Sequence, residues 1–278
     1  MLFKSKNLLF QNLDRTKEVT EISSAQASFL RGVRQEKRFV TLWQWVIMVL
    51  FIGLWELGAR TGAINAFVFS SPSRVVETII SMSKDGSLWY HMGITLAETF
   101  VSFLLILILG IGIAVLLWWN TKLSKIFEPY LVMLNSLPKS ALAPVFIVWL
   151  GANMKTIIVA AVSVAVFGSI LTLYHSFSET EEDRLKLIYT LGGRKKDVLT
   201  KVILPGNIPT VISLMKVNLG LALVGVIIGE FLAARAGLGY LIIYASQVFK
   251  LDIVITSIFL LCVISVLLYH GIARLEKK

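Results

Sequence analysis

The sequence predicts an all-α membrane protein with six transmembrane helices. Of its 278 residues, 56% are hydrophobic and only 16% are charged, a balance typical of polytopic helical membrane proteins rather than of soluble domains. Apolar runs of about 20 residues, long enough to cross a bilayer as a helix, recur along the chain. Lysine and arginine gather in alternate connections between these runs, as expected for a membrane protein of fixed orientation.

The net charge is +10, and the chain has one cysteine, Cys262, and three histidines. In a soluble protein this charge would suggest nucleic acid as a partner, but orientation in a membrane explains it better. One cysteine can form neither an internal disulfide nor a thiolate cluster, and the histidines lack the spacing of metal ligands. We therefore expect no metal site and no nucleic-acid partner.

Residues 1–38 are polar and carry eight lysines and arginines. No apolar run followed by a small-residue cleavage site precedes the first span, so we expect no cleaved signal peptide. This stretch is interpreted as a basic cytosolic arm, partly disordered. An interfacial helix over residues 22–38 is the alternative.

The transmembrane domain is expected to cover residues 39–275. Its six predicted spans are 40–58, 94–118, 126–150, 157–177, 208–232 and 253–272. Trp43, Trp45 and Trp55 lie near the two ends of the first span, as an aromatic belt would place them. Pro138 and Pro144 interrupt the third span, which we expect to be kinked or broken.

Counting lysine and arginine in the connections predicts the orientation. Nineteen lie in the two termini, the second–third connection and the fourth–fifth connection, against six in the other three connections. The positive-inside rule then places both termini and residues 178–207 in the cytoplasm. The sequence predicts a multi-pass protein of the cell membrane.

The first connection on the other side, residues 61–92, predicts a helix of its own. Ser71–Pro72 is a typical helix start, and Gly86 is expected to end the helix. The expected apolar face consists of Val75, Val76, Ile79, Ile80 and Met82. We interpret it as an external helix on the membrane surface.

Residues 178–207 form the one long polar segment within the apolar part of the chain, with eleven charged residues of thirty. Ser178 and Glu181 have the spacing of a capping box, and Gly192–Gly193 supplies a helix stop. Between them Leu185, Ile188 and Leu191 recur at helical spacing. The segment therefore predicts a helix that ends at paired glycines.

A second short helix follows in the same segment, basic at Arg194, Lys195 and Lys196. Its expected apolar stripe is Val198, Leu199, Val202 and Ile203, and Pro205 is expected to end it. A helix–glycine–helix element on one membrane face is suited to docking a partner.

No catalytic constellation is present in the sequence. Gly192–Gly193–Arg194–Lys195 lacks the spacing of a phosphate-binding loop, and Gly237–Leu238–Gly239 is too short for a dinucleotide fingerprint. We therefore expect a transport subunit rather than an enzyme, with no cofactor of its own. An energy-using role would need an ATPase on another chain.

Ionisable residues inside spans are candidates for function. Glu98, Lys139 and Glu230 are our candidates for a translocation path, and Lys139 is hypothesised either to line it or to pair with Glu98 or Glu230. Small residues in two spans allow close helix approach, either for packing within the bundle or for a moving seam. They are Gly110, Gly112, Gly220, Gly225 and Gly229.

At this point the residues resemble the permease subunits of type I ABC importers, in the branch for nitrate, sulfonates, taurine and thiamine precursors. Thr190–Leu191–Gly192 and Leu204–Pro205, with Pro209 beyond, fit that family's coupling-loop pattern, although Lys186–Leu187–Ile188 replaces its Glu-Ala-Ala triplet. The likeness covers roughly residues 40–275. It extends to Trp55–Glu56–Leu57, Ser71–Pro72–Ser73, Gly86–Ser87–Leu88–Trp89, Pro144 with Trp149 and Gly151, and Gly237–Leu238–Gly239–Tyr240.

The resemblance implies a type I importer permease fold with a coupling helix between the fourth and fifth spans. Two permease copies, usually a homodimer, would each dock a cytosolic ATPase that binds ATP and Mg, and an extracytoplasmic binding protein would deliver a small polar or anionic solute. The residues implied in ATPase coupling are Glu181, Glu182, Arg184, Leu185, Ile188, Leu191, Gly192, Leu204 and Pro205.

A secondary active transporter is the alternative function. It would predict internal inverted repeats, broken helices in both halves and ion-coupling carboxylates at the midplane. The sequence contains one span predicted to break and no convincing repeat, which favours the ABC permease. The sequence does not identify the substrate.

Overall fold

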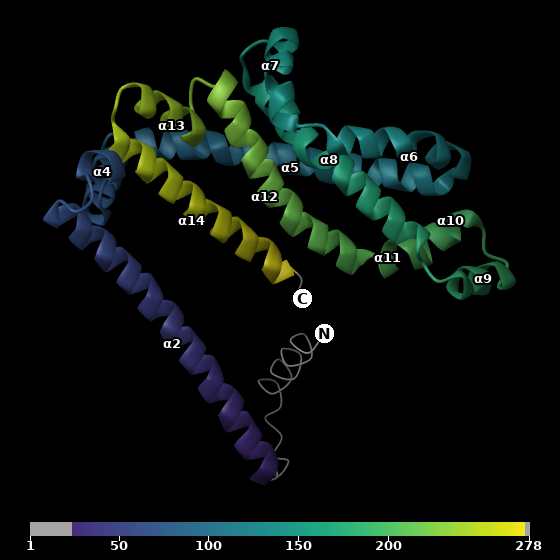
Figure 1. The fold of residues 1–278 in the computed structure, drawn as a ribbon. Coiled ribbons are helices and arrows are strands. Elements are labelled where there is room, and N and C mark those ends of the chain that lie inside the picture. The colour runs from purple at the N-terminus through teal and green to yellow at the C-terminus, as the bar shows by residue number, and fades with distance from the viewer. Residues whose placement is uncertain (1–23, 276–278) are drawn as a thin grey trace. The chain divides into compact units, whose positions relative to one another are not determined.

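The computed structural model describes residues 24–275, and every regular element in that range is a helix (Figure 1). This confirms the all-α fold class. The chain divides into two compact units, residues 1–58 and 59–278, which are described separately. The predicted disorder of the N-terminal arm concerns residues that lie mostly outside the described range.

The first unit contains most of α2, Ser24–Thr61. Its part from Gly32 to Thr61 is long and apolar enough to cross a membrane, and it includes the predicted first span. Residues 24–38 are helical, but α2 is continuous through them into that span. A separate interfacial helix ending at residue 38 is therefore not present.

Three long helices form the centre of the second unit: α5 (Ser87–Trp119), α8 (Met154–Ser178) and α12 (Ile208–Ala233), joined by α14 (Leu251–Leu275) (Figure 1). All four are long and apolar enough to span a membrane. They contain the predicted second, fourth, fifth and sixth spans. Between α8 and α12, Ser169 donates a buried hydrogen bond of 2.8 Å from its hydroxyl to the side-chain oxygen of Asn218.

Glycines let α12 approach α8 closely. A Cβ added at Gly225 would lie 2.6 Å from the Cα of Ala161, and one at Gly229 would lie 3.0 Å from the Cα of Ile157. Gly110 of α5 similarly lies against Ser169. These three glycines therefore serve packing within the bundle, whereas an added Cβ at Gly112 or Gly220 would meet open space in this chain.

The predicted third span is broken, as expected, into α6 (Thr121–Ser136) and α7 (Lys139–Leu150), which meet at 96°. The break lies at Pro138, and the preceding residue, Leu137, is extended at φ −64° and ψ 141°, the conformation that a following proline favours. Pro144, the second proline expected to interrupt the span, lies inside α7, which continues through it. Pro144 has no N–H to donate to the carbonyl of Ser140, four residues earlier. Ser140 is exposed.

The connection before α5 contains α3 (Ala66–Phe69) and α4 (Pro72–Lys84), and the predicted start and stop of α4 are confirmed. Ser71 caps its N-terminus, and Gly86 adopts φ 79° just after its end. Of the predicted apolar face, Val75 and Met82 are buried within the chain, and Val76 and Ile80 are exposed. The position of α4 on the membrane surface stays a prediction.

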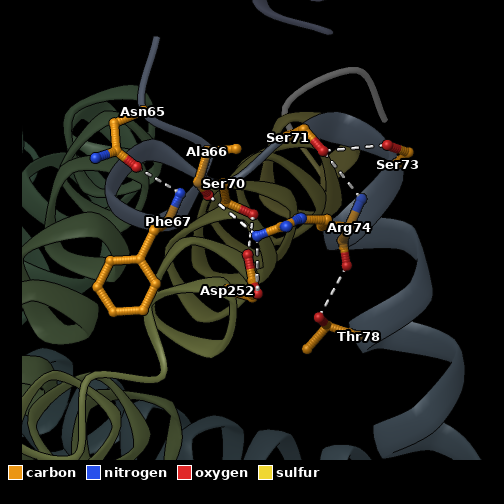
Figure 2. Close-up of polar contacts among 9 residues, drawn as sticks. All are labelled: Asn65, Ala66, Phe67, Ser70, Ser71, Ser73, Arg74, Thr78 and Asp252. Atoms are coloured by element: carbon orange, nitrogen blue, oxygen red, sulfur yellow. Dashed lines mark hydrogen bonds and ion pairs between the residues drawn. The ribbon is translucent and has the colours of Figure 1, made fainter. Parts of the chain in front are cut away.

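A polar cluster fixes the start of α4 to the start of α14 (Figure 2). The Ser70 hydroxyl donates to Oδ1 of Asp252 over 2.6 Å, and Nη1 of Arg74 lies 3.8 Å from Oδ2 of the same carboxylate. Arg74 also donates to the carbonyl of Ala66 over 3.2 Å. Asp252 is in the first turn of α14, where negative charge is favourable.

A short helix that the sequence did not predict, α13 (Leu238–Gln247), lies between α12 and α14. Its buried residues Leu238 and Leu241 pack in one apolar cluster with Leu88 of α5 and Leu261 of α14. Its first residues belong to the Gly237–Leu238–Gly239 motif, whose role becomes clear from its contacts with Glu230.

Candidate functional site

The polar segment after α8 folds as a compact element beginning with α9, Glu182–Thr190. The predicted capping box at Ser178 and Glu181 is wrong, because α8 continues through Ser178 and Glu181 makes no side-chain cap. Glu181 instead accepts a 2.7 Å hydrogen bond from Nε of Arg184, and Glu182 pairs with Lys186 at 3.1 Å. The acidic residues therefore form local ion pairs on an exposed helix.

Helix α9 has one anchored face and one exposed face. Leu185 and Ile188 pack against the buried cluster that contains Phe177, Val198 and Ile203. Leu191 was predicted to share their row, but it lies just after the last residue of α9, as its C-cap, and it is 76% exposed. Leu187, four residues earlier, is 58% exposed beside it, so two large apolar side chains point away from the bundle.

The paired glycines end α9 in a Schellman motif. Gly192 has φ 79° and donates from its N–H to the carbonyl of Tyr189 over 3.0 Å, and Gly193 donates to the carbonyl of Ile188 over 2.9 Å. The predicted stop is confirmed. The two glycines are required for different reasons: Gly192 for its positive φ, and Gly193 because an added Cβ would lie 2.5 Å from Cγ2 of Ile188.

The second half of the element runs through α10 (Lys195–Val198), a π-helical turn (Leu199–Ile203) and α11 (Leu204–Gly206). Val198, Leu199 and Ile203 are buried, and Val202 is half-buried. The prediction that Pro205 ends the helix was wrong, because Pro205 lies at the start of α11, where its missing N–H is not needed. The π-helical turn precedes it. In that turn the N–H of Leu204 donates to the carbonyl of Leu199.

Polar contacts fix this element to the spans. Lys195 donates from Nζ to the carbonyl of Trp119 at the end of α5 over 2.6 Å and lies over the Trp118 and Trp119 rings. Asn207 accepts a 2.5 Å hydrogen bond from the Ser176 hydroxyl of α8. Of the three predicted basic residues, Lys195 is thus an anchor, while Arg194 and Lys196 are exposed.

Asp197 closes the start of α10. Its Oδ2 accepts a 2.9 Å hydrogen bond from the N–H of Arg194. This bond, with the nearby Lys201 ammonium, lowers the pKa of Asp197 below its ordinary value. The carboxylate is therefore held in its charged form at the turn between the two halves of the element.

At the opposite end of the bundle, Glu230 of α12 holds the start of α13. Its Oε1 accepts a 2.7 Å hydrogen bond from the Thr95 hydroxyl of α5, and its Oε2 accepts one of 2.5 Å from the N–H of Gly239. The N–H of Leu238 in turn donates to Thr95 over 2.8 Å. A buried carboxylate thus binds the N-terminus of a helix, where negative charge is favourable.

This contact explains the Gly237–Leu238–Gly239 motif. Gly237 has φ 119°, and an added Cβ there would overlap the carboxyl group of Glu230. A Cβ at Gly239 would lie 2.8 Å from Oε2 of Glu230. Sequence reasoning missed this role of Glu230. The available signal was an acid near the end of a span shortly before two closely spaced glycines.

The structure brings two of the three candidate residues for the path together. Glu98 is 2% exposed, and its carboxyl group lies beside that of Glu230. The hypothesis that Lys139 pairs with either acid was wrong. Its ammonium contacts the carbonyl of Asn135 across the break between α6 and α7, and within residues 24–275 it forms no ion pair with Glu98 or Glu230.

Comparison with known proteins identifies the family. A family model described as the binding-protein-dependent transport system inner membrane component matches residues 106–278. The chain belongs to this family. It is a permease subunit of an ABC importer, a multi-pass inner-membrane protein, as the motifs predicted. The family assignment favours this function over the secondary transporter considered above.

Relatives of similar length support the same conclusion. The chain is 28% identical over 232 residues to the formylaminopyrimidine transport permease protein ThiX of Halalkalibacterium halodurans, covering 83% of this chain and 92% of that protein. It is 24% identical to the putative aliphatic sulfonates transport permease protein SsuC of Bacillus subtilis, covering 92% and 93%. It is 22% identical to the taurine transport system permease protein TauC of Escherichia coli, covering 83% and 86%.

Solved structures show the fold. Two crystal forms of the MetNI methionine ABC transporter, in inward-facing conformations, align with TM-scores of 0.59 and 0.61 at 21% and 20% identity. They cover 66% and 68% of this permease and 92% and 96% of the matched chains. The permease therefore has the type I importer fold.

Proposed function

We propose that this permease forms the translocation path for a small polar or anionic solute of the nitrate, sulfonate, taurine or thiamine-precursor type. An extracytoplasmic binding protein delivers the solute, and a separate ATPase subunit binds ATP and Mg and supplies the energy. The solutes named for the formylaminopyrimidine, sulfonate and taurine permeases support this range. Two copies of the permease pair in the membrane, with both termini in the cytoplasm.

The surface formed by Leu187 and Leu191 is the observation that carries the ATPase partnership. These side chains are 58% and 76% exposed on a helix whose other face is fixed to α5, α8 and α12 through one apolar cluster. Exposed apolar groups on a rigid element favour binding of a partner. We assign ATPase coupling to residues of this element, namely Glu181, Glu182, Arg184, Leu185, Ile188, Leu191, Gly192, Leu204 and Pro205.

Co-purification tests this proposal. The wild-type permease, expressed with its ATPase, should bring the ATPase through affinity purification in detergent. Leu191→Asp should reduce the amount bound at least about tenfold, as expected for loss of a buried apolar anchor worth about 1.4 kcal/mol or more. The matched control is Thr200→Asp, which adds the same charge at another exposed position of the element. Equal recovery from both variants would contradict the assignment.

For the path itself we retain Glu98, Lys139 and Glu230 as candidates. Lys139 lies at the break between α6 and α7, and Glu98 lines a cavity at the end of the bundle opposite the coupling element. Uptake into proteoliposomes by Lys139→Met equal to that of the wild type would remove Lys139 from the path. Glu230 is proposed to act by holding α13 in place.

A further inference from the structure

A cavity of about 560 Å³ opens beside Glu98, between α5, the start of α8 and the connection from α12 to α13. This volume falls within the range of about 300–1,000 Å³ that small-molecule sites occupy. Its walls are mostly apolar, from Ile94, Ala97, Ala152, Met154, Ile157 and Ala233. Three residues supply the polar groups: Glu98, Asn153 and Arg235.

One carboxyl oxygen of Glu98 is left without a partner. The side chain is 2% exposed, its carboxyl group contacts that of Glu230, and its Oε2 accepts no hydrogen bond from any residue between 24 and 275. A carboxyl oxygen can accept a hydrogen bond whether or not the group carries a proton. Oε2 of Glu98 is therefore an acceptor, and leaving a buried acceptor unpaired is unfavourable.

The donors of Thr95, Gly239 and Asn153 are already committed to other acceptors. The Thr95 hydroxyl and the N–H of Gly239 both donate to Glu230. The side-chain amide of Asn153 donates to the carbonyl of Leu150 over 2.6 Å, and its oxygen accepts from two backbone N–H groups of α8. Glu98 also lines the cavity, so the cavity is a second source from which a donor can approach its carboxyl group.

Further unpaired groups continue from this position along α5. The hydroxyls of Thr99 and Ser102 are buried without a hydrogen-bond partner in the described part of the chain. Ser102 follows Glu98 by four residues, so the two lie on the same face of the helix. A polar strip thus leads from the cavity into the bundle.

We propose that this cavity is a solute site of the permease, in which Glu98 accepts a hydrogen bond from an amino group of the transported molecule. The carboxyl pair disfavours an anionic group at that end, and a nitrate ion or a simple sulfonate has no hydrogen to donate to it. Arg235 offers a positive charge for a second, acidic group. The site selects small solutes that carry an ammonium or a ring amino group, and this inference rests on the proposed transport function.

Cysteine protection in the complete transporter tests the site. The only cysteine, Cys262, is changed to serine, and Ala97→Cys introduces a thiol on the exposed part of the cavity wall. The rate of alkylation is measured in proteoliposomes with two probe pairs that each differ by one amino group: taurine against ethanesulfonate, and 4-aminopyrimidine against pyrimidine. Should Ala97→Cys be unreactive, Ala152→Cys on the α7–α8 connection replaces it.

In at least one pair, the amino-bearing probe should protect at a concentration about tenfold or more below that of its partner, as expected for one charge-assisted hydrogen bond. Glu98→Ala should abolish the difference. Glu98→Gln is used where Glu98→Ala does not accumulate, and its loss of charge should reduce the difference. Equal protection within both pairs, no protection by any probe, or a difference that survives both Glu98 variants would overturn the proposal.

The same preparation separates this inference from the proposed function. Recovery of the ATPase and ATP-dependent uptake are measured before labelling. If neither is found, the proposed function fails whatever the labelling shows. If both are found and alkylation does not respond to the amino group, only the solute site fails.

Discussion

Replacing Glu230 by alanine should destabilise the end of the bundle that is opposite the coupling element. The carboxyl group accepts hydrogen bonds from the Thr95 hydroxyl and from the N–H of Gly239, and Glu230 is 1% exposed. Each buried donor that loses its acceptor costs about 1–3 kcal/mol. Two such donors predict a loss of about 2 kcal/mol or more, which lowers the midpoint of thermal unfolding by about 4–8 °C in a chain of this size.

The assay is thermal unfolding of the purified permease in detergent, followed by intrinsic fluorescence. Glu77→Ala is the matched control, because Glu77 is an exposed glutamate of α4 and its loss should shift the midpoint by less than about 2 °C. The second arm is Gly237→Ala, whose added Cβ would overlap the Glu230 carboxyl group. In the Glu230→Ala background that overlap is gone. The free energy of unfolding lost in the double variant should therefore be smaller, by about 1 kcal/mol or more, than the sum of the losses in the two single variants. Strict additivity, or a Glu230→Ala midpoint like that of the control, would refute the reasoning.

Four other predictions concern single positions. Gly192→Val should destabilise the turn by about 1–2 kcal/mol, because valine is strained at the φ of 79° that residue 192 adopts, and it should abolish solute-stimulated ATPase activity. Gly192→Asn should keep the activity, because asparagine tolerates this conformation. Normal activity of Gly192→Val would be inconsistent with a required turn. Gly225→Val should reduce the free energy of unfolding by about 1–3 kcal/mol, because its side chain would overlap Ala161, and it should lower the unfolding midpoint accordingly. Gly220→Ala adds a Cβ into open space and should not; equal effects would contradict the close approach of α8 and α12. Lys195→Gln should speed hydrogen exchange across residues 178–207 about fivefold by losing the bond to Trp119, and a similar change in Lys196→Gln would show that only charge matters. Because the folded-state pKa of Asp197 is lowered, its stabilising contribution is present above the ordinary pKa and is lost as pH falls through the lowered value. Asp197→Asn should therefore exchange faster than the wild type around residue 194 at pH 6, and the difference should shrink as pH falls through the lowered pKa; a difference unchanged in acid would argue against the carboxylate as its source.

Much of the fold can be predicted from patterns of neighbouring residues. Long apolar runs predict spans, Ser71–Pro72 predicts the start of α4, and Gly192 predicts a helix stop, because each depends on a few neighbouring residues. Pro138 and Pro144 show where such patterns become insufficient. Proline permits both a break and an interior position, and tertiary packing decides between them.

The sites were less predictable because their contacts join distant parts of the chain. Glu98 and Glu230 are individually conspicuous as acids in apolar spans, but their contact depends on how α5 and α12 pack. Lys139 has the charge to pair with them, but next to the bend at Pro138 its ammonium contacts the backbone carbonyl of Asn135 instead. Leu191 belongs to the right element, but its exposure follows from where α9 ends, which its spacing alone does not reveal.

The anchoring of α5 and α12 has a mechanical consequence. At one end the apolar cluster around Ile203 holds them with α8, and at the other Thr95 and Glu230 join them side chain to side chain. Two helices that are held together at both ends cannot slide along each other, so a displacement of the coupling element moves both helices along their full length. We therefore expect the helices of one permease subunit to move largely as a rigid body, with opening and closing at the interface between the two proposed copies.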